Sequence, residues 1–263
     1  MRSIIPAIGV LLSLAVLRAD PAPAQPQAAD ADIERVLRGL DDVGKHLQAF
    51  SAKLKLTETD NAFATPSTIR SGNVWFERRP DGSARIHVRF DWRTEEGSKF
   101  AHPEKKDYLL DGRWLLDRNY QTRQEIKREV LKPGQKMDLF KLGEGPFPLP
   151  IGQDPQDVRK SFDVKFIAPA KEDPPSTTHL DLIPRQGTDL ARKFYSVSVW
   201  VDEKTHMPVR VDTLDAKKEN TRSTELGGIV VNPPQGLKES DFRLPDVDPK
   251  QWNMRVESLN DSM

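Results

Sequence analysis

The five histidines of the chain are the side chains best suited to proton transfer or metal binding, and they are scattered. They are His46, His87, His102, His179 and His206. None pairs with another at the spacing of a zinc site, and the chain lacks the sequence patterns of metalloproteases, serine hydrolases and phosphate-binding loops. His87 falls on the polar side of a predicted strand, so we expect it to be solvated.

Acidic pairs give no better candidate for general acid–base catalysis. Asp41-Asp42 and Glu95-Glu96 are adjacent in sequence, which is typical of a solvated surface. Carboxylates distant in sequence can meet in space, so a secreted hydrolase stays as an alternative. The residues themselves favour a protein that is not an enzyme and needs no metal and no cofactor.

Composition narrows the class of partner. The chain has 263 residues, no cysteine, and 40 basic against 40 acidic residues. Nucleic-acid binding would need a basic excess, so we expect no nucleic-acid partner. Without cysteine there is neither a disulfide nor a thiol that could carry a lipid anchor.

The N-terminus is typical of a secretory signal peptide. A short basic start, Met1-Arg2-Ser3, precedes a largely apolar run over residues 4–17. That run is shorter than the about 20 residues that span a bilayer, and small-residue cleavage sites follow it. We expect a signal peptide over 1–24, a linker over 25–31, and a mature protein free in the periplasm.

The elements that follow alternate between one helix and many strands. Apolar residues recur at three- and four-residue steps from Ile33 to Phe50, which predicts an amphipathic helix. Strict alternation on both sides of the Pro80-Asp81-Gly82 turn then predicts a hairpin. Its shared apolar face is expected to line the interior of the protein, with the residues Val74, Phe76, Ile86, Val88, Phe90 and Trp92.

The middle of the chain differs from this pattern. Residues 143–152 are rich in glycine and proline and cannot form a regular strand or helix. Asp154-Pro155 predicts the start of a short helix, and strands resume beyond residue 162. The predicted fold is mainly β with α: a curved antiparallel sheet whose apolar face is covered by helices.

Several motifs resemble those of the outer-membrane lipoprotein carrier family, the LolA-like proteins, between residues 33 and 245. They are Gly72-Asn73-Val74-Trp75-Phe76-Glu77-Arg78-Arg79-Pro80, Tyr108-Leu109-Leu110-Asp111-Gly112, Pro146-Phe147-Pro148-Leu149, His179-Leu180-Asp181-Leu182-Ile183-Pro184 and Phe242-Arg243-Leu244-Pro245. The chain departs from the family after the proline, where Ala84-Arg85-Ile86 replaces the usual arginine-tryptophan.

The resemblance implies an unclosed β-barrel, with helices filling an apolar interior that accepts acyl chains. It also implies a lid, which would include Phe147, Leu149 and Ile151, and an inward arginine that holds the lid closed. Arg78 and Arg79 are the candidates for this latch; Arg78 shares the parity of Val74 and Phe76 and is preferred. The carrier domain would cover 32–247, followed by a C-terminal tail over 248–263.

The function implied is a soluble periplasmic carrier, expected to be a monomer. It would bind the acyl chains of lipoprotein or lipid, take them from a membrane donor complex and deliver them to an acceptor protein or membrane. The alternative of the same fold is a lipid-sensing regulatory module similar to RseB.

Overall fold

The structure is a computed structural model that describes residues 26–63, 65–135, 140 and 151–259. The predicted signal peptide and the lid residues Phe147 and Leu149 lie outside the described residues. Within them, no helix is both long enough and apolar enough to cross a membrane.

The first helix, α1 (Pro26–His46), is amphipathic, as its apolar spacing predicts. Ile33, Val36, Leu37 and Leu40 are buried along one stripe. The prediction that the helix extends to Phe50 is wrong, because strand β1 (Ala49–Asp60) begins three residues after His46. Leu47 and Phe50 are nevertheless fully buried, so their apolar character reflects the core rather than the helical period.

The predicted hairpins are present. Strand β2 (Thr68–Arg78) pairs with β3 (Ala84–Glu95) around a turn in which Gly82 adopts a φ of 77°. Strand β4 (Ala101–Asp111) pairs with β5 (Trp114–Asn119) through Gly112, and β6 (Gln124–Glu129) follows. On β2, Val74 and Phe76 are buried because one face of the antiparallel sheet packs inward, whereas residues 85–88 of β3 are buried on both faces.

The second half begins with the predicted short helix, α2 (Pro155–Ser161). The carboxylate of Asp154 accepts a hydrogen bond from the backbone of Gln156 at 2.7 Å and caps it. The remaining strands are β7 (Phe162–Ile167), β8 (Thr177–Pro184), β9 (Phe194–Asp202), β10 (Pro208–Asp215) and β11 (Asn220–Val231), with a short helix α3 (Asp189–Lys193) before β9.

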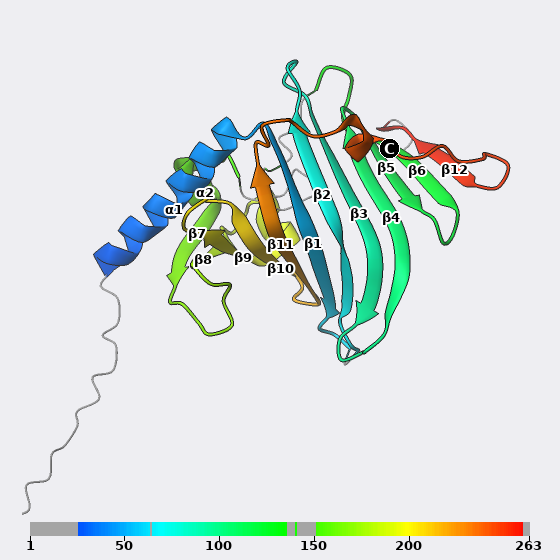
Figure 1. Ribbon diagram of the computed structural model, residues 1–263. Helices are drawn as coiled ribbons and strands as arrows, with labels where there is room; N and C mark the ends of the chain where they lie inside the picture. The colour runs from blue at the N-terminus through cyan, green and yellow to red at the C-terminus, as the bar shows by residue number, and fades with distance from the viewer. Residues whose placement is uncertain (1–25, 64, 136–139, 141–150, 260–263) are drawn as a thin grey trace, which may run out of the picture.

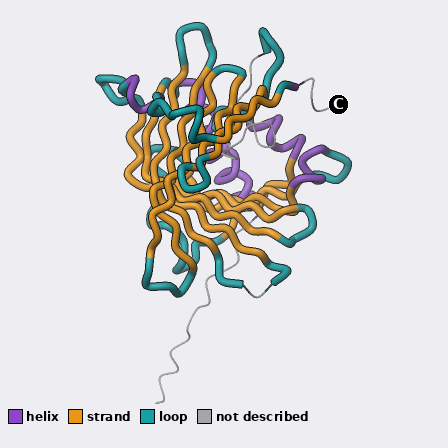
Figure 2. Tube along the Cα trace, turned by 90° about the vertical axis from the view of Figure 1, so that its right-hand side faces the viewer, coloured by secondary structure: helices purple, strands orange, loops and turns teal. Residues whose placement is uncertain are grey.

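All strands join one twelve-stranded sheet in the order β12-β6-β5-β4-β3-β2-β1-β11-β10-β9-β8-β7. The sheet is antiparallel except at its β12 edge, and β7 and β12 do not pair, so it is not closed. It curls strongly, and α1 and α2 lie against the β7 side (Figure 1; Figure 2). This confirms the predicted fold class of a curved, unclosed β-barrel with helices on its apolar face.

Beyond β11, the end of the chain also packs on the sheet, and part of the 248–263 range that the sequence predicts as a C-terminal tail forms a strand. Residues 232–252 return over the sheet and include the 3-10 helix η1 (Glu239–Phe242), which packs on β3. Strand β12 (Asn253–Glu257) then pairs in parallel with β6. We refer to residues 232–257 as the C-terminal segment.

Candidate functional site

Five of the six residues predicted to line the interior come together on the inner face of β2 and β3. Val74 lies opposite Val88 and Phe76 opposite Ile86, and Phe90 lies opposite Gly72. Each of the five apolar side chains is at most 4% exposed. Their cross-strand pairing places them on one continuous apolar surface.

Trp92 is the exception, because a β-bulge interrupts the alternation. Gly72 pairs with Phe90 and Ser71 with Trp92, so Asp91 is the extra residue of β3. The bulge turns Trp92 to the outer face, where it is 48% exposed. Gly72 permits this geometry, since a Cβ there would lie 1.8 Å from the carbonyl oxygen of Arg89. The prediction that Trp92 lines the interior is therefore wrong.

Described side chains fill the centre of the apolar interior. The rings of Phe50, Phe76 and Phe140 form a cluster, with centroids of Phe76 and Phe140 4.6 Å apart. Ile151, the one predicted lid residue that the structure describes, is 1% exposed and belongs to the same core. Between α1, α2 and strands β8 and β9, an apolar cavity of only about 10 Å³ remains, too small to hold more than about one water molecule.

Close backbone contacts hold α1 in place. A Cβ at Gly44 would lie 2.1 Å from the Cα of Gly152, so the helix and the segment after residue 150 touch through two glycines. The backbone of Gly152 also donates a hydrogen bond to the carbonyl of Leu40 at 3.0 Å. Farther along α1, a Cβ at Gly39 would lie 2.7 Å from the His206 ring in the β9–β10 turn.

The two candidate latch arginines have different partners. Arg78 is exposed at the end of β2, and its guanidinium donates to the carbonyl of Gly44 in α1 at 3.4 Å. Arg79 instead forms two parallel hydrogen bonds with Asp111, at 2.6 and 2.9 Å. Arg78 is thus the arginine that contacts α1, at the residue where the helix meets Gly152.

A buried polar network on the outer face was not expected from the sequence. His87 is 3% exposed, so the prediction that it is solvated is wrong. Its Nε2 lies 2.9 Å from the carboxylate of Asp107, and its Nδ1 lies 2.6 Å from the carbonyl oxygen of Asp241 in η1. The C-terminal segment covers this histidine, which the alternation along β3 alone could not indicate.

Arg85 fixes the same segment. Its guanidinium forms two hydrogen bonds to Glu239, at 2.9 and 2.7 Å, and a third to Glu77. It also lies 4.0 Å above the ring of Phe242. The hydrogen bonds from Arg85 lower the pKa of the Glu239 carboxyl below its usual value. Farther along, Arg118 pairs with Glu125 and donates to the carbonyl of Pro245.

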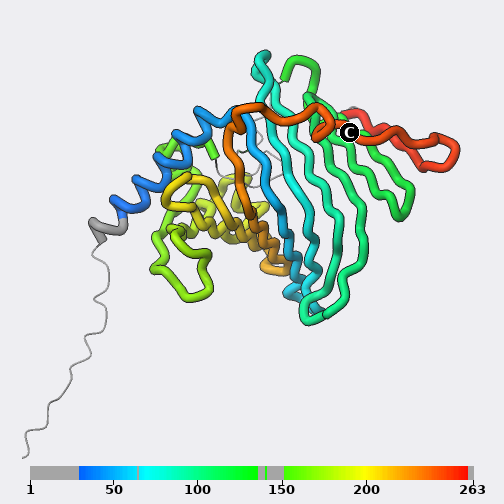
Figure 3. Tube along the Cα trace, in the orientation of Figure 1, coloured from blue at the N-terminus to red at the C-terminus, as the bar shows by residue number. Residues whose placement is uncertain are grey.

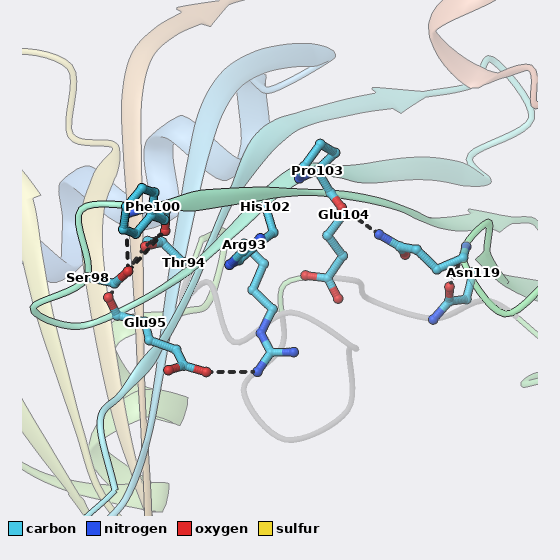
Figure 4. A pocket seen from close by; sticks show the side chains of 10 residues that line it. Arg93, Thr94, Glu95, Ser98, Phe100, His102, Pro103, Glu104 and Asn119 are labelled. Carbon is cyan, nitrogen blue, oxygen red and sulfur yellow. Dashed lines mark hydrogen bonds and ion pairs between the residues drawn. The ribbon is translucent and has the colours of Figure 1, made fainter.

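A second, larger cavity lies near the β3–β4 turn and is polar. Its volume is about 440 Å³, and its lining comes from β3, β4 and the end of β5 with the turn after it (Figure 4). The lining residues are Arg93, Thr94, Glu95, Ser98, Phe100, His102, Pro103, Glu104, Asn119 and Gln121. Across the described chain, no group of three or more histidine, aspartate or glutamate residues could hold a metal ion.

Comparisons with known proteins give structural matches only. No protein-family model matches the chain, and no curated protein does. Among solved structures, MucB matches with a TM-score of 0.45 and 14% identity, over 82% of this chain and 63% of MucB. The chain therefore spans less than two thirds of MucB.

For two further solved structures, the match extends over nearly the whole length of the other protein. An uncharacterized conserved protein from Thermus thermophilus matches at a TM-score of 0.45 and 12% identity, over 86% of this chain and 99% of that one. The LolA superfamily protein NE2245 from Nitrosomonas europaea matches at 0.32 and 12%, over 81% and 97%. All three matches are at 14% identity or below.

Proposed function

We propose that the protein is a non-enzymatic carrier that binds acyl chains of lipoprotein or lipid between its sheet and α1. The observation that carries the proposal is the construction of the core. In the described chain, the apolar face of an unclosed sheet is covered by an amphipathic helix, with Phe140 and Ile151 packed in the same core. A helix can move aside without breaking the hydrogen bonds of the sheet, whereas a closed barrel cannot open in this way.

The contacts of α1 support such a movement. Besides its buried apolar stripe, the helix is held by the Gly44–Gly152 contact and by separate polar contacts rather than by a ladder: Gly152 donates to Leu40 at 3.0 Å, and Arg78 donates to Gly44 at 3.4 Å. Removing α1 would expose Leu180, Leu182 and Val199 on β8 and β9, which belong to the same core as the apolar residues of β2 and β3. An acyl chain would restore the apolar contacts that the helix gives up, at about 0.8 kcal/mol for each buried methylene group.

A reversible crosslink tests whether α1 controls access. A Cβ at Gly39 would lie 3.2 Å from the Cβ of His206, near the roughly 3.8 Å of a disulfide. The chain has no other cysteine, so Gly39→Cys/His206→Cys gives one defined crosslink between α1 and the β9–β10 turn. We expect the oxidised form to lose binding of a fluorescent fatty acid, and the reduced form to regain it.

The single-cysteine variants His206→Cys and Gly39→Cys/His206→Ser serve as matched controls and should bind the probe whatever the redox conditions; the serine removes the ring that would lie 2.7 Å from a Cβ at position 39. Equal probe binding by the oxidised and reduced double variant would show that α1 is not the gate. Native mass spectrometry of protein purified gently from its source should find lipid adducts. If the purified protein carries no lipid adduct and does not bind the fluorescent fatty acid, it is not a lipid carrier.

We further propose that the carrier works in the periplasm as a monomer, after removal of residues 1–24. It would receive cargo from a membrane donor complex and deliver it to an acceptor protein or membrane. The basic start and the apolar run over residues 4–17 support export.

A further inference from the structure

The exposed aromatic side chains of the described chain lie near one end of the sheet, on or beside strands β1 to β4 and on β9. Phe63 and Phe100, in or beside hairpin turns, are 68% and 74% exposed. Trp92 and Tyr195 lie on strands β3 and β9 and are 48% and 46% exposed. Single exposed apolar residues are ordinary, but four aromatic residues gathered in one region mark an interaction surface.

Backbone contacts join the turns that carry them. The backbone of Glu96, in the β3–β4 turn, donates to the carbonyl of Ser67 at 2.9 Å, and the backbone of Asn61 donates to the carbonyl of Glu219 at 2.6 Å. The ammonium of Lys218 lies 3.7 Å from the ring centre of Tyr195. We call the β1–β2, β3–β4 and β10–β11 turns together the hairpin end; it forms the lower tip of the sheet in Figure 3.

The polar cavity opens at this hairpin end. Phe100 and Ser98 belong both to its lining and to the β3–β4 segment that bears the exposed ring. The lining combines cationic and anionic groups: Arg93 lies 3.7 Å from Glu95, and Glu104 accepts a hydrogen bond at 3.0 Å from Arg70, which lies outside the lining. A cavity with both signs of charge, hydroxyls and amides is complementary to a zwitterionic group such as phosphocholine.

The charges at the hairpin end also favour a neutral membrane surface. The turns hold Glu96 and Glu219 against Lys99, Lys217 and Lys218. The strand ends that flank them add Asp60, Glu95 and Asp215, and the cavity adds Arg93, so the two signs nearly balance. A surface of this balance gains little from an anionic membrane, where clusters of basic residues supply the attraction. Aromatic side chains, by contrast, enter the interface of a neutral bilayer without such charges.

We propose that the hairpin end docks on the surface of a zwitterionic phospholipid bilayer. Phe63 and Phe100, the most exposed rings, enter the acyl boundary, while Trp92 and Tyr195 lie at the level of the head groups. A head group occupies the polar cavity, with its phosphate at Arg93 and its ammonium at Glu95. The inference stands apart from the proposed carrier function, since a protein that takes up no acyl chain could dock in the same way.

Sedimentation with phosphatidylcholine vesicles tests the docking surface. Wild-type protein should partition onto the vesicles to the same extent in low and high salt. Phe63→Ala/Phe100→Ala should lower the partition coefficient by roughly a hundredfold, about tenfold for each ring. Both rings are exposed, so the melting temperature should not change. Val230→Ala/Met254→Ala removes two exposed apolar side chains outside the hairpin end and should bind like wild type.

A second arm examines the cavity. Arg93→Gln should weaken vesicle binding several-fold without changing the melting temperature, and soluble glycerophosphocholine should compete with vesicles for wild type but not for this variant. The proposal is overturned if wild type ignores the vesicles, if the double phenylalanine variant binds as wild type, or if the control variant loses binding equally. A wild-type dimer that dissociates in the double variant would assign the surface to a second copy of the chain instead.

Discussion

At the scale of single residues, the contact between Arg78 and Gly44 adds to the packing that holds α1. The hydrogen bond is 3.4 Å long and lies at an exposed arginine, so it contributes about 1 kcal/mol or less. Arg78→Leu should leave the fold intact, shift α1 and the neighbouring segment toward an open arrangement, and make the protein retain a bound fatty-acid probe longer. Stopped-flow measurement of probe binding and release gives the rates.

Arg79→Leu is the matched control for this prediction. Arg79 forms its two hydrogen bonds with Asp111 on the neighbouring hairpin and none with α1 in the described chain. Its loss should reduce stability by about 1 kcal/mol without changing probe kinetics. If Arg79→Leu alters the rates while Arg78→Leu behaves as wild type, the latch has been assigned to the wrong arginine. If neither variant changes the rates of probe binding and release, neither arginine acts as a latch.

At the scale of elements, charged groups attach the C-terminal segment to the sheet. The strength of this attachment should therefore decrease at low pH. Arg85 lowers the pKa of the Glu239 carboxyl from its ordinary value of 4.5. A carboxyl whose pKa is lower in the folded than in the unfolded protein stabilises the fold at pH values above the unfolded-state pKa. This contribution to stability is lost as the pH falls through the folded-state pKa. The contact should therefore be present at neutral pH and weaken below about pH 4.5.

Hydrogen exchange of residues 239–257, followed from pH 7 to pH 3 and corrected for the intrinsic rate, measures this attachment. Wild-type protection should decrease in acid before the sheet itself unfolds. Glu239→Gln should show lower protection at neutral pH and a smaller further loss in acid. Equal acid dependence in both proteins would mean that other groups hold the segment. Asp107 and His87, which form the adjacent buried pair, would be examined next.

Local periodicity predicts the strands and hairpins of this chain because each alternating segment packs one face inward. Structural features that depend on contacts between residues distant in sequence are not predicted by this periodicity. The bulge that turns Trp92 outward arises from pairing with Gly72, and the burial of His87 arises from a segment more than 150 residues away. The parallel pairing of β12 has no local pattern either. The apolar interior was thus predictable in its centre, at Phe76 and Val88, but not at its boundary.

At the scale of the whole molecule, the filled interior and the hairpin end together predict how cargo would leave. Transferring a chain of about 16 carbons into water costs on the order of 12 kcal/mol, so spontaneous release should be very slow. Delivery should instead require contact with the acceptor, and the transfer rate of a fluorescent lipid should rise with the concentration of acceptor vesicles. A rate that stays flat as vesicles are added would indicate release through water and contradict the contact mechanism.

The Phe63→Ala/Phe100→Ala variant separates the two proposals in the same assay. Its rings lie outside the apolar core, so it should bind the lipid as wild type does while transferring it more slowly to zwitterionic vesicles. Normal binding with slow transfer supports both the carrier function and the docking surface. Normal binding with normal transfer keeps the carrier and removes the docking surface, because the core that holds the acyl chain and the turns that meet the bilayer are different parts of the sheet.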